Sequence, residues 1–211
     1  MPEDLTLWGV GTSRTMRAHW MLLELGLEYQ FNPIRSRTGE THAEEFMRLN
    51  PRHKIPVLRH KSVVITESAA IIQYLSEVWS KPTEIHVPAG SAGRAVLNEW
   101  CYFIVTELDA ASLNVVRRHD GLRHIYGDSP TAVEAAKEYF RHNLEAMTSR
   151  LSTRNEYLLD DRLSIADILL MTCLDWAAAS EIALPDTFLQ YRQRIAQRPA
   201  YQAARKRNFA E

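Results

Sequence analysis

The sequence predicts an α/β domain with the element order βαβαββα, followed by an all-helical domain. Three observations support this: short alternating elements fill the first 80 residues, a stretch rich in Pro, Gly and Ser follows at 80–93, and long helical stripes of apolar residues come after it. A chain of 211 residues, 45% hydrophobic, is long enough for two small domains with a core each. We therefore expect one domain at 1–81 and a second at 88–211, with the break near residues 81–87.

The first domain is expected to alternate strands and helices. Leu5, Leu7 and Val10 indicate a strand, and Gly26 directly after the next helical segment is typical of a helix C-terminus. The predicted elements are a strand ending at Gly11, a helix over 14–25, a strand over 27–34, a short capped helix over 41–50, two short strands around a turn at 60–62, and a helix that opens with Glu67 and Ser68. The inner face of this last helix is expected to comprise Ile71, Ile72, Leu75, Val78 and Trp79.

Long amphipathic helices are predicted in the second domain, because apolar residues there recur every three or four positions. The first stripe comprises Leu97, Cys101, Ile104, Leu108, Ala111 and Val115, and the second comprises Val133, Ala136, Phe140, Leu144, Met147 and Leu151. A third helix begins at LSIAD (163–167), where Ser164 can cap the amide of Asp167 and Asp167 can bond back. Leu163 can pack against Ile168 as a hydrophobic staple.

Composition excludes several classes of function. With 25 basic against 26 acidic residues, the chain lacks the charge footprint of a nucleic-acid or acidic-membrane partner. No basic and apolar leader opens the chain and nowhere do 18 apolar residues run together, so we expect a cytoplasmic protein that does not span a membrane. Cys101 and Cys173 lie on apolar stripes outside any C-x-x-C pair, which predicts core residues. The histidines lack a metal-ligand spacing, so no metal is expected.

Pro56 stands directly before a predicted strand, in the segment PRHKIPVL (51–58). Proline cannot donate to a sheet ladder, so it belongs at a strand start, an edge or a bulge. It can open an edge strand in the trans form, or it can form a cis bond, which costs only about 0.5–1 kcal/mol at X-Pro. A cis turn would direct the N–H and C=O of Ile55 out of the sheet, where an extended peptide can pair with them.

Three segments carry a family resemblance: KIPVL (54–58), TESAAIIQYL (66–75) and LSIADILL (163–170). With these segments and this element order, nearly the whole chain resembles the cytosolic glutathione transferases, as a serine/threonine-type bacterial member. The resemblance implies a thioredoxin-like first domain, a cis bond before Pro56, glutathione as co-substrate and a homodimer. It also implies an enzyme that activates the thiol of glutathione for attack on small hydrophobic electrophiles or organic hydroperoxides.

The resemblance also places the glutathione site, at Lys54, Ile55, Pro56, Glu67 and Ser68. Ile55 would pair with the cysteinyl unit as an added strand. Ser68 and its amide open a helix, whose unpaired N–H groups suit the γ-glutamyl carboxylate, and Glu67 suits the ammonium. The alternative for Glu67 is that it merely complements the helix dipole.

The glycine carboxylate of the tripeptide needs a cation at the other end of the site. Lys54 occupies the family's position for this contact, and His53 and Arg52 are weaker candidates. The alternative is that the basic segment PRHK (51–54) is a solvated turn.

The family places its thiol-activating residue between the first strand and the first helix, here GVGTSRTMR (9–17). Counting back from ELGL puts the hydroxyl on Thr12, with Ser13 one step further. A hydroxyl that donates to a thiolate contributes roughly 1.5–3 kcal/mol, which lowers the thiol pKa by about one to two. The first domain has no Cys, which disfavours the cysteine-type classes, and the Ser-Ser-Cys signature of the maleylacetoacetate isomerases is absent. Helix capping is the alternative role of Thr12 and Ser13.

The electrophile pocket is expected between the domains. The candidates on the first long helix are Trp100, Phe103, Glu107 and Asn114 or Arg117, although aromatic residues at helical spacing also suit a core. The alternative function, from a different class, is a non-catalytic glutathione-transferase-like interaction module. The enzyme is favoured because one set of residues is retained together: Thr12, Ser13, Ile55, Pro56, Glu67 and Ser68.

Overall fold

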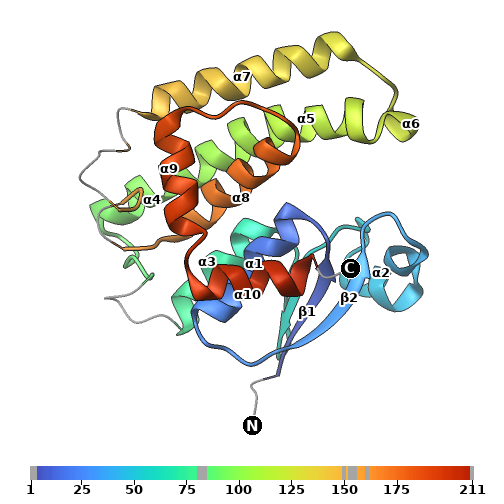
Figure 1. Ribbon diagram of the computed structural model, residues 1–211. Coiled ribbons are helices and arrows are strands. Elements are labelled where there is room, and N and C mark those ends of the chain that lie inside the picture. Colours follow the sequence, from blue (N-terminus) through green and yellow to red (C-terminus); the bar gives the residue numbers. More distant parts are fainter. Residues whose placement is uncertain (1–3, 80–84, 149–150, 152–155, 160–161, 210–211) are drawn as a thin grey trace. The chain divides into compact units, whose positions relative to one another are not determined.

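The computed structural model describes residues 4–79, 85–148, 151, 156–159 and 162–209 (Figure 1). The chain divides into two compact units, one formed by Met1–Lys81 with Ala196–Glu211 and the other by Pro82–Ile195. The C-terminal helix therefore groups with the first unit, a feature that the expected boundary of 88–211 did not include. The domain boundaries stay a prediction, and the break expected near 81–87 lies partly outside the described residues.

A four-stranded sheet with the order β2-β1-β3-β4 is the base of the first unit. Its strands are β1 (Leu5–Val10), β2 (Gln30–Arg35), β3 (Val57–His60) and β4 (Val63–Ile65). β1 pairs in parallel with β2 and antiparallel with β3, with Leu7 opposite Leu58, and β3 pairs antiparallel with β4. β1 and β3 are buried because they lie in the centre of the sheet, whereas the edge strands β2 and β4 are largely exposed.

The helices of the first unit confirm the predicted order βαβαββα. They are α1 (Ser13–Glu24), the short 3-10 turn η1 (Gly39–His42), α2 (Glu44–Leu49), α3 (Ser68–Trp79) and α10 (Pro199–Asn208). α1 packs against both α3 and α10 (Figure 1). Gly26 ends α1 as predicted: it has a φ of +65°, and its amide donates to the carbonyl of Leu23 over 3.1 Å.

Local details of the first unit differ from the expectation. The expected capped helix over 41–50 is split into η1 and α2, and Ala43, which precedes α2, supplies no side-chain cap. Val78 is 47% exposed instead of lying on the inner face of α3, and Ser76 is buried in its place. The Ser76 hydroxyl tolerates this burial because it donates to the carbonyl of Gln73 over 2.7 Å.

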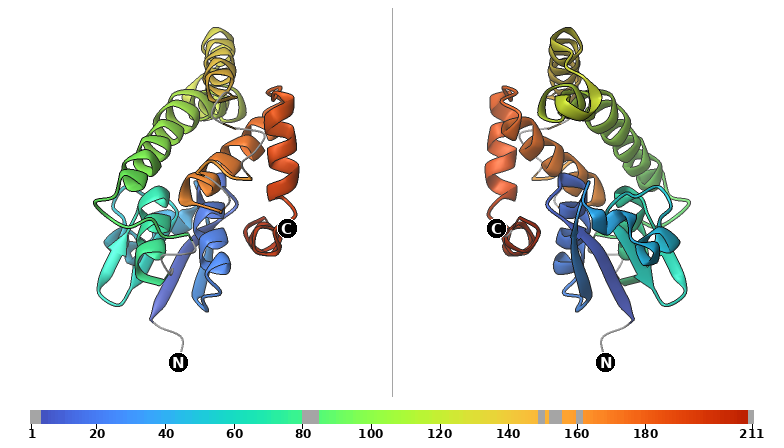
Figure 2. Two further views of the ribbon diagram at one scale, coloured as in Figure 1. Left: turned by 90° about the vertical axis from the view of Figure 1, so that its left-hand side faces the viewer. Right: turned by 90° about the vertical axis from the view of Figure 1, so that its right-hand side faces the viewer.

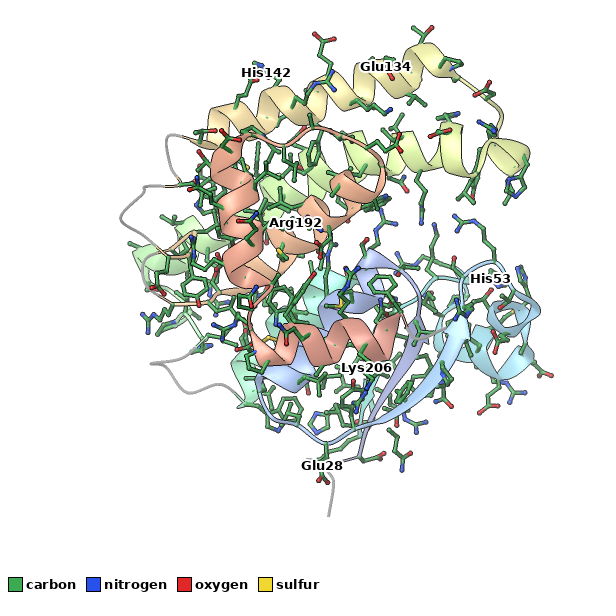
Figure 3. All side chains as sticks on the ribbon, viewed as in Figure 1. Glu28, His53, Glu134, His142, Arg192 and Lys206 are labelled. Atoms are coloured by element: carbon green, nitrogen blue, oxygen red, sulfur yellow. The ribbon has the colours of Figure 1, made fainter. Side chains whose placement is uncertain are left out.

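The described residues of the second unit are almost entirely helical. The elements are α4 (Ala92–Phe103), η2 (Ile104–Leu113), α5 (Asn114–Val116), η3 (Arg117–Gly121), α6 (Arg123–Tyr126), α7 (Pro130–Thr148), α8 (Ile165–Ala179) and α9 (Asp186–Ile195). α7 runs beside η2 and α5 (Figures 1 and 2). The predicted stripe of α7 is buried from Val133 to Met147, and Figure 3 shows Glu134 and His142 on the outer side of this helix.

The first long helix of this unit departs from the predicted period. η2 and η3 are π-helical, with about one more residue per turn than an α-helix. The buried face consequently moves by one position along the sequence, because Ser112 and Val116 are buried where Ala111 and Val115 were expected. Ala111 is exposed and Val115 is only partly buried.

The start of α8 confirms the predicted capping interaction. The amide of Ser164 donates to Asp167 Oδ2 over 2.7 Å, and the hydroxyl of Ser164 lies 2.6 Å from the same oxygen. Asp167 Oδ1 accepts from the amide of Leu158 over 2.8 Å and from the hydroxyl of Tyr191 over 2.7 Å. The fully buried carboxylate therefore holds the start of α8, the segment before it and α9 together.

Candidate functional site

The loop before β3 is organised by a buried asparagine that sequence reasoning missed. Asn50 is 1% exposed, and its Nδ2 donates to the carbonyl of Lys54 over 2.8 Å while its Oδ1 accepts from the amide of Arg52 over 3.1 Å. His53 has a φ of +54°, and its amide donates to the carbonyl of Asn50 over 3.1 Å. Asn50 therefore sets the path of the chain into the Ile55–Pro56 bond, which is cis as expected.

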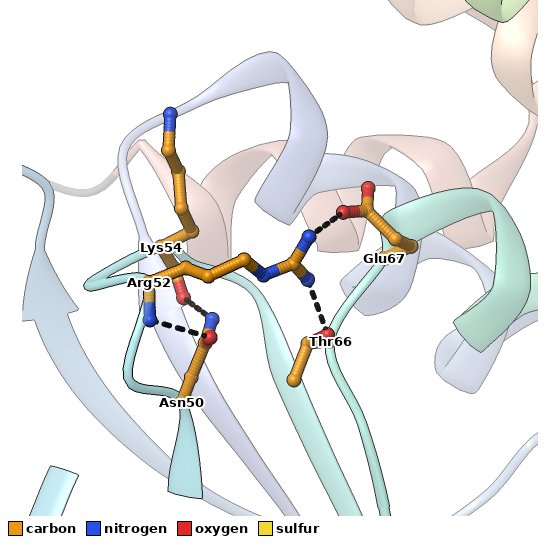
Figure 4. A network of polar contacts seen from close by, with 5 residues as sticks. All are labelled: Asn50, Arg52, Lys54, Thr66 and Glu67. Carbon is orange, nitrogen blue, oxygen red and sulfur yellow. Dashed lines mark hydrogen bonds and ion pairs between the residues drawn. The ribbon is translucent and has the colours of Figure 1, made fainter. Parts of the chain in front are cut away.

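The three basic residues of this loop point in different directions. Arg52 reaches Glu67, where its Nη1 donates to Glu67 Oε1 over 2.9 Å, and its Nη2 donates to Thr66 Oγ1 over 2.6 Å (Figure 4). Lys54 is exposed, and its amine extends away from this pair (Figure 4). The ring of His53 stacks on that of His42, with centroids 4.3 Å apart, and its Nδ1 donates to the carbonyl of Thr41 over 2.8 Å.

Glu67 lies directly before α3 and keeps part of its carboxylate available. The side chains of Arg52 and Glu67 are 53% and 69% exposed, so water screens this ion pair. Among the described residues, Arg52 bonds only the Oε1 atom, and Oε2 has no partner. Oε2 of the carboxylate can therefore accept a hydrogen bond from a second cationic group.

Ser68, the first residue of α3, is backed by a buried arginine. Arg17 on α1 is 1% exposed, and its Nη1 donates to Ser68 Oγ over 3.2 Å. Because Ser68 Oγ is the acceptor in this bond, the Ser68 hydroxyl keeps its own proton, which has no acceptor within the described part of the chain. The start of α3 therefore offers a hydroxyl donor, unpaired backbone amides and a nearby positive charge, a combination that suits an anion. Arg17 was missed, although an arginine inside the apolar face of α1 was a signal.

Thr12 is the N-cap of α1 and lies in a dense network. The amide of Thr15 donates to Thr12 Oγ1 and the amide of Thr12 donates to Thr15 Oγ1, both over 3.0 Å, so the two residues form a reciprocal capping box. The two hydroxyl oxygens are also 3.0 Å apart. Helix capping is therefore a role of Thr12, and donation to a thiolate would have to use the same hydroxyl.

Ser13 follows as the first residue of α1. It is half-buried, and its hydroxyl has no partner among the residues that the structure describes. Both hydroxyls predicted between the first strand and the first helix therefore lie at the start of α1. The Thr12 hydroxyl is hydrogen-bonded, and the Ser13 hydroxyl is available to a ligand.

The electrophile-pocket candidates lie in the second unit. Trp100 is 5% exposed and helps to line a cavity of about 550 Å³ with Ile85, Val87, Val96, Leu158 and Leu163. Phe103 contacts Trp100 edge-on, with ring centroids 6.2 Å apart. Glu107 Oε2 accepts from the hydroxyl of Tyr139 over 2.6 Å, which ties η2 to α7.

The polar candidates Asn114 and Arg117 contact each other. Arg117 Nη2 donates to Asn114 Oδ1 over 2.8 Å, and the guanidinium lies 5.4 Å from the ring centroid of Trp176. The assignment of an electrophile pocket to this unit stays a prediction.

Cys101 and Cys173 are both buried and are not joined by a disulfide, which confirms the core interpretation. Burial raises the pKa of the Cys101 thiol to about 12, so it is not a thiolate near neutral pH. In the described part of the chain, no group of three or more His, Cys, Asp or Glu could hold a metal ion. None of the described helices has the length and apolar character needed to cross a membrane.

Comparison with known families shows to which family this chain belongs. The family model described as "Glutathione S-transferase, N-terminal domain" matches residues 3–77, and "Glutathione S-transferase, C-terminal domain" matches residues 103–199. Glutathione S-transferase GstA of Escherichia coli O157:H7 is 31% identical over 173 residues, which cover 77% of this chain and 78% of the relative. Glutathione S-transferase U19 of Arabidopsis thaliana is 29% identical over 167 residues, which cover 79% and 69%. The chain belongs to the glutathione S-transferase family, and its enzyme class is glutathione S-transferase.

Solved structures agree on the fold. A glutathione transferase from Methylococcus capsulatus has a TM-score of 0.80 at 27% identity and covers 97% of this chain and 98% of its own. The glutathione transferase URE2P6 from Phanerochaete chrysosporium, solved in complex with oxidized glutathione, has a TM-score of 0.85 at 23% identity and covers 98% and 96%. These likenesses confirm a thioredoxin-like first domain followed by a helical domain.

Proposed function

We propose that the protein binds glutathione in its first unit and activates the thiol for attack on small hydrophobic electrophiles or organic hydroperoxides. The observation that carries this proposal is the start of α3, where Ser68 keeps a hydroxyl proton and Glu67 keeps a carboxylate oxygen. The γ-glutamyl end of glutathione carries one carboxylate and one ammonium, which match these two groups in charge. Family membership supports glutathione as the ligand.

The rest of the tripeptide would lie along the loop before β3. The backbone of Ile55, next to Pro56, pairs with the cysteinyl unit as an added strand. Lys54, exposed and directed away from the Arg52–Glu67 pair, takes the glycine carboxylate. Related structures at 23% and 22% identity to this chain were solved with oxidized glutathione and with glutathione bound, which supports this ligand.

Thiol activation is assigned to the start of α1. The hydroxyl of Thr12, or that of Ser13, donates a hydrogen bond to the thiolate and favours it over the thiol. An unassisted hydroxyl cannot take a proton near neutral pH, so its role is donor and not general base. The electrophile would be held by the second unit, with Trp100, Phe103 and Glu107 as its candidates.

A non-catalytic, glutathione-transferase-like interaction module is the second candidate. The observation in its favour is that the Thr12 hydroxyl already serves the capping box. In either function we expect a cytoplasmic homodimer that uses neither a metal nor a nucleic-acid or membrane partner.

The test combines glutathione binding by calorimetry with turnover of a generic electrophile. The wild-type protein should do both, and Thr12→Ala should lower turnover near neutral pH by about tenfold or more while the glutathione affinity changes little. Ser13→Ala is the matched neighbouring variant: a large drop there beside unchanged turnover in Thr12→Ala would move the role to Ser13. Binding without any turnover would favour the interaction module, and absence of binding would refute both candidates.

A further inference from the structure

The last residue of the C-terminal helix lies inside the loop that carries the proposed thiol-activating hydroxyls. Asn208 is 1% exposed and 196 residues away from Thr12 in sequence. Its Nδ2 donates to the carbonyl of Thr12 over 3.1 Å, and its Oδ1 lies 2.7 Å from the hydroxyl of Thr15 and 3.3 Å from the amide of Gly11. The carbonyl of Asn208 accepts from the same amide over 2.9 Å. The side-chain amide orientation is fixed, because a backbone N–H only donates and a carbonyl only accepts.

These contacts determine the direction of the hydrogen bond between the two threonines. The carbonyl of Thr12 already accepts from Asn208 and, over 3.0 Å, from the amide of Met16, so both of its lone pairs are used. The hydroxyl of Thr15 lies 2.8 Å from this occupied carbonyl and 2.7 Å from Asn208 Oδ1, so its single proton goes to Asn208 Oδ1, which keeps a lone pair for it. Thr12 must then be the donor in the contact between the two hydroxyls. A thiolate is a stronger acceptor than a neutral hydroxyl oxygen, so this proton can turn from Thr15 to a bound thiolate.

Asn208 is itself held firmly by the rest of α10. At the start of the helix Arg198 forms an ion pair with Glu24 of α1, which also accepts from the indole of Trp20 over 3.0 Å. In the middle, Tyr201 packs edge-on against Trp20, with ring centroids 5.1 Å apart. α10 is thus held against α1 along its length. Asn208, at the end of α10, therefore bonds the backbone of the β1–α1 loop from a fixed position.

We propose that Asn208 is a positioning residue for the thiol-activating loop: it fixes the backbone of Gly11 and Thr12 and makes the Thr12 hydroxyl a donor. The proposal rests on the proposed function only for its catalytic consequence. The positioning of the loop by α10 can be measured on the protein without any ligand.

The first arm of the test is amide hydrogen exchange of the ligand-free protein. Asn208→Ala should exchange about tenfold faster at the amides of Thr15 and Met16, which bond Thr12, as expected for the loss of one net hydrogen bond to that residue. Gln202→Ala is the matched control on the same helix, because Gln202 is exposed and, among the residues that the structure describes, its side chain bonds only the carbonyl of Ala196. Exchange that is unchanged at the loop in Asn208→Ala would overturn the proposal.

The second arm is the pH dependence of turnover with glutathione and a generic electrophile. Asn208→Asp keeps the size and the acceptor oxygens, but it loses the donor to Thr12 and adds a negative charge beside the thiolate. The pH at which turnover reaches half of its maximum should rise by about one unit or more, whereas the KM for glutathione should change less. A lowered melting temperature with an unmoved profile would mean that Asn208 is only structural, which overturns the catalytic part. If the wild-type protein has no turnover, the proposed function fails, whereas the exchange result still decides whether Asn208 positions the loop.

Discussion

Replacing Glu67 by glutamine tests the proposed ligand separately from the fold. Glu67→Gln removes one negative charge and keeps the size of the side chain. Its structural cost should be small, because the ion pair with Arg52 is exposed on both sides and such pairs contribute about 0–1 kcal/mol. A first-turn carboxylate also contributes about 0.3–1 kcal/mol through the helix dipole.

The cost in affinity should be larger than the cost in stability. The ammonium of the γ-glutamyl group would bind Oε2 of Glu67, and a hydrogen bond to a charged group contributes about 1.5–3 kcal/mol. Because the Glu67 side chain is 69% exposed, solvent screening places the loss near or below the lower end of that range, about 1–2 kcal/mol. The dissociation constant for glutathione should therefore rise about five- to thirtyfold.

Calorimetry and thermal unfolding of two matched variants separate a role of Glu67 in glutathione binding from a role in stability. Arg52→Gln breaks the same ion pair and leaves the carboxylate free, so it should lower stability by a similar small amount without weakening glutathione binding. The reasoning is refuted if Glu67→Gln lowers the melting temperature and leaves the affinity unchanged. It is also wrong if Arg52→Gln loses as much affinity as Glu67→Gln.

Three further predictions concern stability and assembly. Burial lowers the pKa of His19 from 6.5 to about 4. Between these two pH values the unfolded chain binds more protons than the folded protein, so a fall in pH favours unfolding. The free energy of unfolding, measured in urea, should therefore be about 2 kcal/mol lower near pH 5 than near pH 7. His19→Gln should flatten this slope, whereas substitution of an exposed histidine should not. Asp167→Ala should lower the free energy of unfolding by about 3 kcal/mol or more, because it leaves buried donors unpaired, and a smaller loss would contradict the central role of its carboxylate. Sedimentation at micromolar concentration should give a dimer mass, since Val63 and Val64 are 44% and 40% exposed on the edge strand β4, and a clean monomer would refute this.

The order of elements could be predicted because each depends on local patterns. Alternation marked the strands, Gly26 marked the end of α1, and SIAD marked the start of α8. Gly26 and SIAD lie where the sequence placed them, whereas the strand expected over 27–34 is found at Gln30–Arg35. The failures arose where packing overrides the local period. The π-helical turns of η2 shifted the buried face after Leu108, and no residue pattern in the sequence announced the extra residue per turn.

Some residues of the candidate site could likewise be predicted from the local sequence, and others could not. Glu67 and Ser68 are neighbours at a helix start, so their joint position followed from the sequence alone. Arg17 beneath Ser68 and Asn208 beneath Thr12 could not be predicted, because each contact joins segments that only the folded chain brings together. Asn50 was missed for another reason: a buried asparagine that organises a loop has the same sequence signature as an asparagine in a solvated turn.

Thiol activation is measured by the ionisation of glutathione bound to the protein, followed by thiolate absorbance as the pH is raised. We expect bound glutathione to titrate about one to two pH units below the free thiol, and Thr12→Ala to return the titration most of the way to the free value. A bound thiol that titrates like free glutathione would contradict thiol activation by this protein.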